Sequence, residues 1–549
     1  MPNIQELKRY RNIHMIGIGG TSMSGIAEIL NQWGFNVTGS DANSSAVTDK
    51  LIKDGIKVTI GHSHYDVDEA DLVVYSAAIK PDDPELKRAK DLGIETAIRA
   101  DFLGEITKAY RNTICVAGTH GKSTTTSMVS LCFLESAKDP SIQIGADLEQ
   151  IGGNYKVGKS EFFVLESCEY VESFLKFYPK AEIILNIDDD HLDYFKSLDN
   201  IKTAFSNFVK LLPDDGILVY NADDPNSEHL SQYTKAKSIT FGINKQTANF
   251  VAKNINYNSD GCASFDVYHN NVFYKSFRLS VPGRHNVLNA LSCIALCNEY
   301  GIDRNDIKNA ILKFKGAGRR FEFVGEYNDA KIYDDYGHHP SEIAAVANAM
   351  KNKEYNHSWV VFQPHTYSRT KEHLKEFAQV LTDFDNIIVT DIYAAREKDT
   401  LGISSLDIVK EIEALDRKAL YISSFDDIID FLKRELQPGD ILITQGAGTI
   451  TSLGRKLANP DYGNHNNESN AETNTINDNY NVSKFEEPVV QEPTVQAPRL
   501  QDIQVEEPQI EEPKTDAEII EAENETQKAE HLESVAQRLR NIKNKKDDE

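Results

Sequence analysis

The chain has 549 residues, enough for about three domains of ordinary size, and its 40% hydrophobic content is sufficient for large cores. A formal net charge of −26 argues against nucleic acid or an anionic membrane as the main partner. No run approaches the roughly 18 apolar residues of a membrane helix, residues 1–10 show no secretory pattern, and the six cysteines include no C-x-x-C pair. We therefore expect reduced thiols and a cytoplasmic protein without membrane insertion.

Residues 13–37 predict a strand, a loop, a helix and a second strand. The loop holds three glycines, Gly17, Gly19 and Gly20, and Asp41 follows the second strand. On general grounds this pattern binds a dinucleotide, with the acid placed to take a ribose hydroxyl. The pattern is incomplete, because Ser22 stands where G-x-G-x-x-G has its third glycine. Strands and helices continue to alternate through this region, so we predict a first domain with a parallel sheet over residues 1–108.

A second predicted domain, residues 109–318, begins with ICVAGTHGKSTTTS at residues 114–127. An apolar strand, a glycine loop and a helix form an arrangement that cradles a polyphosphate, because backbone N–H groups and the helix dipole face the anion. Lys122 supplies a cation for the phosphates, and the Ser123 hydroxyl can ligate Mg²⁺. A plain glycine-rich turn is the weaker alternative. The spacing departs from G-x-x-x-x-G-K-[ST], since Val116 stands where that pattern has glycine.

Two polar side chains follow buried runs in the same domain. Glu166 ends FFVLE, and His191 follows AEIILNIDDD. Isolated residues of this kind are usually structural or solvent-facing, but beside a Lys-Ser phosphate loop they become candidates for holding Mg²⁺.

Farther along, PGRHNVLNALSC places His285 and Asn286 before an apolar helix, which by itself would be a cap region. Cys293 and Cys297 lie four residues apart on that predicted helix. We expect these two thiols to be core residues rather than metal ligands.

The third predicted domain, residues 319–458, has strands near Ile332, Val360, Ile388 and Ile441, which indicates a second Rossmann-like sheet. Arg319 and Arg320 open it. Arginine pairs are usually solvated, although an arginine that reaches phosphates from another domain is a recurrent device. Further polar residues fall on two strand–helix loops: Asp335, Tyr336, His338 and His339 on one, His365 and Arg369 on the other.

Residues 459–549 change in composition. They are first Asn-rich and then acidic and proline-spaced, and residues 460–549 carry 22 acidic and 9 basic residues, half of the net charge. This composition predicts disorder. Near the end, Leu532, Val535, Leu539 and Ile542 fall at helical spacing. The tail is therefore either a solubilising segment or one whose terminal helix docks on a protein partner.

The motifs together resemble those of the Mur ligases, which build the peptide of bacterial peptidoglycan. GTHGKST at residues 118–124 is similar to the family's nucleotide loop, and GIGGTSMSGIA at residues 17–27 to the opening of its UDP-N-acetylmuramate:L-alanine ligases. Residues 186–193 match N-x-x-x-D-H-x-D, and residues 333–340 (YDDYGHHP) match a third-domain signature. The resemblance covers residues 13–457. It implies an α/β protein with a Rossmann-like UDP-binding domain, a central P-loop ATPase-type domain and a Rossmann-like third domain, with the disordered tail outside the pattern.

The resemblance also implies a role for each candidate residue. ATP would be bound by Gly118, Thr119, His120, Gly121, Lys122, Ser123, Thr124, His285, Asn286, Arg320 and Asp335. The UDP-sugar and the amino acid would be bound by Gly17, Gly19, Gly20, Asp41, Ser76, Tyr336, His338, His365 and Arg369. The metal would be held by Ser123, Glu166 and His191. At the first-domain loop, the resemblance favours UDP over NAD.

The implied reaction joins L-alanine to UDP-N-acetylmuramate, with ATP as co-substrate and Mg²⁺ as cofactor, in peptidoglycan precursor synthesis. ATP phosphorylates the lactyl carboxylate, and the amine then attacks the acyl phosphate. Lys122 and Arg320 would neutralise charge, and His338 is our candidate for taking the amine's proton or holding the amino acid.

Two alternatives remain. The first is a sister ligase that joins a preformed peptide to the same sugar. The second is a degenerate relative that acts as a scaffold through its tail, against which the intact Lys122, Ser123, Glu166 and His191 argue.

Overall fold

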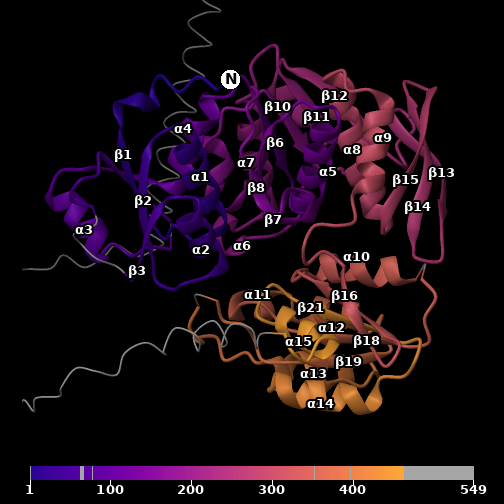
Figure 1. Cartoon of the computed structure of the whole chain (residues 1–549). Coiled ribbons are helices and arrows are strands. Elements are labelled where there is room, and N and C mark those ends of the chain that lie inside the picture. The colour runs from indigo at the N-terminus through magenta and orange to yellow at the C-terminus, as the bar shows by residue number, and fades with distance from the viewer. Residues whose placement is uncertain (1, 62–66, 77, 352, 396, 463–549) are drawn as a thin grey trace, which may run out of the picture. The chain divides into compact units, whose positions relative to one another are not determined.

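The computed structural model describes residues 2–462 except 62–66, 77, 352 and 396 (Figure 1). Strands in this part of the chain form sheets of five, ten and six strands. The strands fall within residues 12–98, 112–282 and 322–445, so each sheet belongs to one predicted domain. The domain boundaries at 108 and 318 stay predictions. The predicted terminal helix and its stripe of apolar residues lie outside the described residues.

A parallel five-stranded sheet with the order β3-β2-β1-β4-β5 forms the first unit of the fold. Its strands are β1 (Asn12–Ile16), β2 (Asn36–Asp41), β3 (Lys57–Ile60), β4 (Leu72–Tyr75) and β5 (Glu95–Ile98). Its helices are η1 (Leu7–Arg9), α1 (Thr21–Gln32), α2 (Ala46–Lys53), α3 (Pro84–Asp91) and α4 (Arg99–Lys108). The predicted strand–loop–helix–strand is confirmed. The strand order reverses between β1 and β4, and ligands of such sheets bind outside the carboxyl ends of the strands at that point.

The ten-stranded sheet has the order β15-β14-β13-β12-β11-β10-β6-β9-β7-β8. Its strands are β6 (Asn112–Ala117), β7 (Ser141–Leu148), β8 (Gly153–Lys156), β9 (Phe162–Glu166), β10 (Ala181–Ile184), β11 (Ile217–Asn221), β12 (Lys237–Gly242), β13 (Phe250–Tyr257), β14 (Cys262–His269) and β15 (Val272–Pro282). Its helices are α5 (Lys122–Glu135), η2 (Glu149–Ile151), η3 (Tyr170–Lys176), α6 (Leu192–Phe195), α7 (Leu198–Val209), η4 (Leu230–Tyr233), α8 (Arg284–Glu299) and α9 (Arg304–Lys313).

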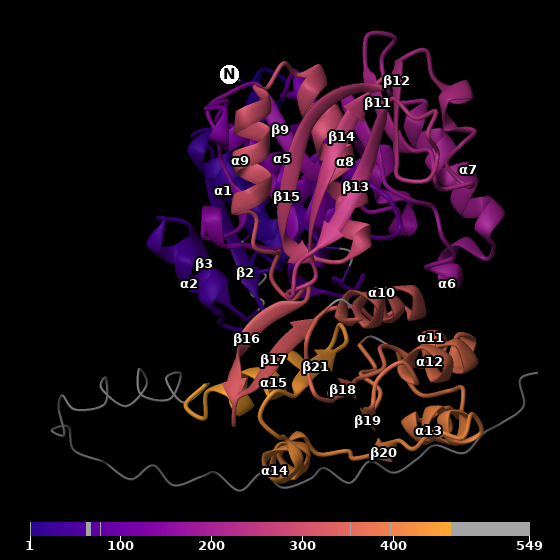
Figure 2. The same ribbon diagram turned by 90° about the vertical axis from the view of Figure 1, so that its right-hand side faces the viewer.

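Strand β6 is buried on both faces, as expected for a parallel strand covered by helices. Ile114 and Val116 join the core beneath α5 and α8, while Cys115 and Ala117 face the opposite core. At the far edge, β13, β14 and β15 form antiparallel ribbons against which α8 and α9 pack (Figure 2).

The six-stranded sheet has the order β16-β17-β21-β18-β19-β20, with only β16 antiparallel among its described pairings. Its strands are β16 (Glu322–Tyr327), β17 (Ala330–Asp335), β18 (Ser358–Phe362), β19 (Asn386–Val389), β20 (Leu420–Tyr421) and β21 (Ile441–Gln445). Its helices are α10 (Pro340–Met350), α11 (Tyr367–Glu372), α12 (Leu374–Leu381), α13 (Ser405–Glu413), α14 (Phe425–Glu435) and α15 (Thr451–Ala458). Helices α10, α12 and α13 cover one core and α14 and α15 the other, so the predicted Rossmann-like arrangement is confirmed.

No helix in the described part of the chain is long and apolar enough to cross a membrane.

Candidate functional site

The phosphate loop lies between β6 and α5, where the sequence predicted it. Gly118 and Gly121 have φ of +139° and +86°, a backbone region that favours glycine. A Cβ on Gly118 would lie 2.9 Å from the Cβ of Leu185, so the loop also needs the missing side chain. Asn186 fixes the loop, because its Oδ1 accepts the His120 N–H at 2.8 Å and its Nδ2 donates to the His120 carbonyl at 3.0 Å.

Lys122, the first residue of α5, donates a set of hydrogen bonds at the loop. Its Nζ donates to the carbonyl oxygens of Gly118 and Thr119 at 2.7 and 3.0 Å, and to Glu169 at 3.0 and 3.1 Å. The Glu169 side chain is only 2% exposed. Burial alone would lower the pKa of Lys122, but the Glu169 carboxylate outweighs this and raises it above its usual value. Lys122 is therefore a cation at the loop before any phosphate binds.

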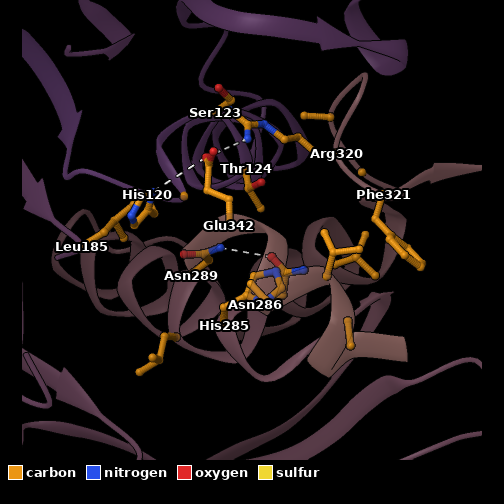
Figure 3. A pocket seen from close by; sticks show the side chains of 18 of the residues that line it. His120, Ser123, Thr124, Leu185, His285, Asn286, Asn289, Arg320, Phe321 and Glu342 are labelled. Carbon is orange, nitrogen blue, oxygen red and sulfur yellow. Dashed lines mark hydrogen bonds and ion pairs between the residues drawn. The ribbon is translucent and has the colours of Figure 1, made fainter. Parts of the chain in front are cut away.

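Beside the loop lies a cavity of about 290 Å³, lined mainly by apolar atoms (Figure 3). The predicted ATP residues that line it are His120, Gly121, Ser123, Thr124, His285, Asn286, Arg320 and Asp335. His285 and Asn286 were predicted to precede the helix, but α8 begins at Arg284, so both residues lie in its first turn. Burial lowers the pKa of His285 to about 4, so its ring is neutral at neutral pH. A flat, uncharged heterocycle fits such a lining.

A second cavity, of about 1070 Å³, borders the other side of the loop. It collects residues predicted for three different tasks: Thr119, Lys122 and Ser123 for phosphate, Glu166 and His191 for metal, and Tyr336, His338, His365 and Arg369 for substrate. Ser123 and Arg320 border both cavities. A group transferred from a nucleotide in the first cavity would therefore enter the second.

Glu166, the last residue of β9, and His191, the residue before α6, both border the second cavity. Glu166 Oε2 accepts the Gly145 N–H at 2.6 Å, and a Cβ on Gly145 would fall 2.6 Å from Glu166 Oε1. His191 has φ of +57°, uncommon for a residue other than glycine, and its N–H donates to Asp190 Oδ1 at 2.7 Å. Backbone conformations of this kind persist where surrounding contacts fix them, often at functional sites.

The two arginines predicted at the start of the third domain have different environments. Arg319 Nε donates to the fully buried Asp334 at 3.0 Å, and Arg319 Nη2 donates to the Gly446 carbonyl at 2.6 Å. These bonds hold the first residue of the predicted third domain against β17 and the end of β21. Arg320 faces Glu342, with Nη1 to Oε1 at 3.3 Å (Figure 3). Arg320 borders both cavities, whereas Arg319 borders only the larger one, and the role of Arg320 at the phosphates stays a prediction.

His338 lies on the loop after β17. Its Nδ1 lies 3.1 Å from the Tyr336 carbonyl, and its ring packs against the rings of Tyr336 and His365. Burial lowers the pKa of His338 to about 4, despite the Glu342 carboxylate, so the imidazole is neutral at neutral pH. A neutral imidazole beside a cavity is able to accept a proton.

Arg369 borders the second cavity, but its guanidinium is already paired with a carboxylate. Its Nη2 donates at 2.7 Å to Oδ1 of Asp190 in the ten-stranded unit, and the two side chains are 12% and 10% exposed. Burial alone would raise the pKa of Asp190, but the Arg369 charge holds it well below its usual range. Arg369 therefore ties α11 to the loop that carries His191. Its neighbour His365 has its pKa lowered to about 4 by burial.

The first-domain candidates form a separate group at the reversal point of the five-stranded sheet. Gly17 has φ of +78°, and a Cβ on it would lie 3.8 Å from the Cβ of Ser76. The Gly19 N–H donates to Asp41 Oδ2 at 2.9 Å, so this carboxylate braces the glycine loop. Gly17, Gly19, Gly20, Asp41 and Ser76 border neither of the two cavities described, but Thr21, the residue after the loop, borders the larger one.

Several residues of the site had no signal in the sequence that singled them out. Glu169 follows Glu166 outside any recognised motif. Ser341 Oγ lies 2.9 Å from His120 Nε2, which joins α10 to the phosphate loop. Glu342 lies between His120 and Arg320 (Figure 3). Burial alone would lower the pKa of His120, but the carboxylates of Asp188 and Glu342 raise it to about 9. Glu342 also completes the capping box of α10, in which His339 takes the place of the usual Ser or Thr.

Comparison with known proteins agrees with this geometry. Three family models match: "Mur ligase family, catalytic domain" at residues 12–111, "Mur ligase middle domain" at residues 116–297 and "Mur ligase, glutamate ligase domain" at residues 319–448. The UDP-N-acetylmuramate–L-alanine ligase of Acetivibrio thermocellus is 48% identical over 452 residues, 82% of this chain and 96% of that protein. The enzyme of the same name from Caldanaerobacter subterraneus is 47% identical over 82% of this chain and 98% of its own length.

Among solved structures, UDP-N-acetylmuramate-alanine ligase from Thermotoga maritima superimposes with a TM-score of 0.70 at 28% identity, covering 82% of this chain and 99% of that one. A murein peptide ligase from Psychrobacter arcticus, at 24% identity and a TM-score of 0.60, shares the fold. With its three sheets, its phosphate loop and its matches to all three domain models, the chain belongs to the Mur ligase family.

Proposed function

We propose that the chain joins L-alanine to UDP-N-acetylmuramate at the expense of ATP, which becomes ADP and phosphate. The observation that carries the proposal is the meeting of two cavities at Ser123 and Arg320. The smaller cavity has a lining that suits a heterocycle. The larger cavity is lined by Tyr336 and His338, which are predicted to bind substrate. Relatives with 44–48% identity over about four fifths of the chain that bear this activity in their names support the choice of substrates.

ATP would place its base against His285 and Asn286 and its phosphates on the loop of residues 118–124. The lactyl carboxylate of the sugar attacks the terminal phosphorus, the bond to ADP breaks, and an acyl phosphate forms. Lys122 and Arg320 neutralise the charge that develops during this transfer. The amine of L-alanine then attacks the carbonyl carbon and phosphate leaves, so no enzyme nucleophile is needed.

For the second step the amine must lose a proton. His338 borders the larger cavity and is positioned by Tyr336, so we assign it the task of accepting this proton or holding the amino acid; its pKa of about 4 makes it a weak base and favours the second task. The UDP portion would bind at the glycine loop of residues 17–20, with Ser76 beside it.

Ser123, Glu166 and His191 fit a Mg²⁺ ion, because they border one cavity and Ser123 and Glu166 offer the oxygen ligands that Mg²⁺ prefers. Gly145 supports this fit, since its N–H orients the Glu166 carboxylate and its missing side chain lets that carboxylate lie directly against the backbone. When bound, the ion would neutralise phosphate charge. Since ATP and a UDP-sugar are cytoplasmic metabolites, we place the reaction in the cytoplasm.

Phosphate release tests the proposal. Purified protein receives ATP, Mg²⁺ and UDP-N-acetylmuramate together with L-alanine, L-serine, glycine or a peptidoglycan tripeptide. We expect the highest kcat/KM with L-alanine. Turnover with the tripeptide alone would identify the sister ligase, and no turnover with any acceptor would favour the scaffold.

Three variants test the proposed roles of the site residues. Lys122→Ala should abolish turnover in a folded protein, because it removes the cation at the transferred phosphate. Tyr336→Phe and His338→Ala should raise KM for L-alanine more than KM for ATP. If only KM for ATP changed, both residues would belong to the nucleotide site instead.

A further inference from the structure

A cluster of three thiols lies in the core of the ten-stranded unit, away from both cavities. Cys132 comes from α5, and Cys293 and Cys297 come from successive turns of α8. All three are fully buried. The Sγ atoms of Cys132 and Cys293 are 3.5 Å apart, those of Cys293 and Cys297 are 3.9 Å apart, and all three lie within 4.8 Å of one another. The sequence predicted two of these thiols as core residues; it did not predict that a third would meet them.

The distances exclude a disulfide, whose sulfur atoms lie about 2.05 Å apart. They place three sulfur atoms around a common centre, as in a site that binds one thiophilic atom. Among the described residues, no histidine or carboxylate joins the three thiols as a fourth ligand. A structural zinc ion needs four protein ligands, so the cluster is incomplete for zinc.

The net charge of the occupied site narrows the choice of the bound atom further. The cluster belongs to an apolar core, where an unpaired charge costs several kcal/mol. Three thiolates around a monovalent or divalent metal ion would leave a net negative charge there, whereas three thiolates around a trivalent centre are neutral. We propose that Cys132, Cys293 and Cys297 form a binding site for trivalent arsenic, supplied as arsenite. This site is separate from the proposed ligase activity.

The reaction balances without an oxidant or reductant. Arsenite is the neutral acid As(OH)₃ at neutral pH. Three As–O bonds break, three As–S bonds form, and the three hydroxides leave as water. Burial raises the pKa of Cys132 and Cys297 well above the usual range, so these two thiols each supply a proton. Burial alone would raise the pKa of Cys293 as well, but its hydrogen bonds with the other two thiols lower it to about 6, so at neutral pH the third proton comes from solvent. A small uncharged acid can enter a buried site through local opening of the native state.

The product would link α5 to α8. Helix α5 begins with Lys122 and Ser123 at the phosphate loop, and α8 begins beside His285 and Asn286 at the smaller cavity. Cys132 is ten residues beyond Lys122, which is about 15 Å along the helix axis. Bound arsenic would thus fix the two helices to each other without touching ATP, and it should raise the melting temperature of the native protein.

The test is intact mass spectrometry of the full chain under native conditions. The chain is incubated with sodium arsenite and a thiol-free reductant until the mass distribution is constant. We expect one adduct that adds an arsenic atom and removes three hydrogens. Cys293→Ala should reduce this adduct at least tenfold and abolish the rise in melting temperature. Cys115→Ala, which removes a buried thiol of the same domain outside the cluster, should leave both unchanged.

Three results would overturn the proposal. They are no adduct in the wild-type protein, an adduct that removes only two hydrogens and retains a hydroxyl, or a three-thiol adduct that persists in Cys293→Ala. If Cys293→Ala does not fold, Cys132→Ala on the other helix provides the same comparison.

Discussion

At the scale of single residues, the ion pair of Lys122 and Glu169 explains how a lysine is held at the phosphate loop before ATP arrives. Glu169→Gln keeps the shape of the side chain and removes its charge. A hydrogen bond to a charged group contributes roughly 1.5–3 kcal/mol, so the variant should lower the middle-domain unfolding transition by about 5 °C in the absence of ATP. Differential scanning calorimetry measures this shift. Glu149→Gln, at an exposed position, is the control, and equal shifts in both variants would contradict the account.

His338 provides a second prediction, because its pKa of about 4 in the folded protein lies below the usual 6.5. Between these values the unfolded chain binds more protons than the folded one, so stability is lost as the pH falls from 6.5 towards 4. From pH 7 to pH 5, His338 should account for about 1–2 kcal/mol of the loss in the third domain's unfolding free energy, and His338→Gln should recover that share.

Tryptophan fluorescence can isolate the third domain for this measurement. The chain has two tryptophans, and Trp359 is buried in β18. Urea unfolding in a Trp33→Phe background therefore reports the third domain. If the third domain lost the same unfolding free energy between pH 7 and pH 5 with and without His338, the lowered pKa of His338 would be wrong.

At the scale of elements, Arg369 and Asp190 join α11 to the loop that carries His191. Removing one partner of a buried pair leaves the other charge unpaired, so Arg369→Gln and Asp190→Asn should each lower kcat/KM for L-alanine. In the double variant the two losses should not add, and the double-mutant cycle should show a coupling factor of about ten. If the loss of kcat/KM in the double variant equals the product of the two single losses to within about twofold, the pair does not act as a unit.

The elements also show what could be predicted from the sequence. The loop between β6 and α5 was predicted correctly because glycines and Gly-Lys-Ser mark a strand–helix junction locally. Four strands of the third domain, β17, β18, β19 and β21, were also predicted, because parallel strands form continuous apolar runs, whereas the edge strands β16 and β20 were not. The antiparallel strands β13, β14 and β15 were not predicted, although their pairing is local: short turns join each strand to the next, and His269 pairs with Val272 across one of them.

The residues of the site also divide into those that belong to local motifs and those that only folding brings together. Lys122, Ser123 and His191 belong to local motifs, and they border the expected cavity. Glu169 and Glu342 become site residues only because folding brings them to Lys122 and Arg320. Nothing in their own neighbourhoods in the sequence marks them, and Glu342 has a second, purely structural role as a helix cap.

At the scale of the whole molecule, the last residue that the structure describes, Tyr462, borders the larger cavity, and every predicted site residue precedes it. A chain ending at Tyr462 should keep kcat and both nucleotide KM values within about twofold, a change under roughly 0.5 kcal/mol. Ending the chain at Ala458 is a useful comparison, because it also removes Tyr462 from the larger cavity. A large loss of activity at the Tyr462 boundary would mean that residues 463–549 support the catalytic part.

The central claim is that a carboxylate is phosphorylated at the junction of the two cavities and then attacked by L-alanine. Isotope transfer tests it directly. UDP-N-acetylmuramate carrying ¹⁸O in its lactyl carboxylate is incubated with ATP, Mg²⁺ and L-alanine, and the released phosphate is analysed by mass spectrometry. An acyl phosphate predicts that each phosphate released with product carries one labelled oxygen. Phosphate free of label, formed together with the alanyl product, would contradict the account.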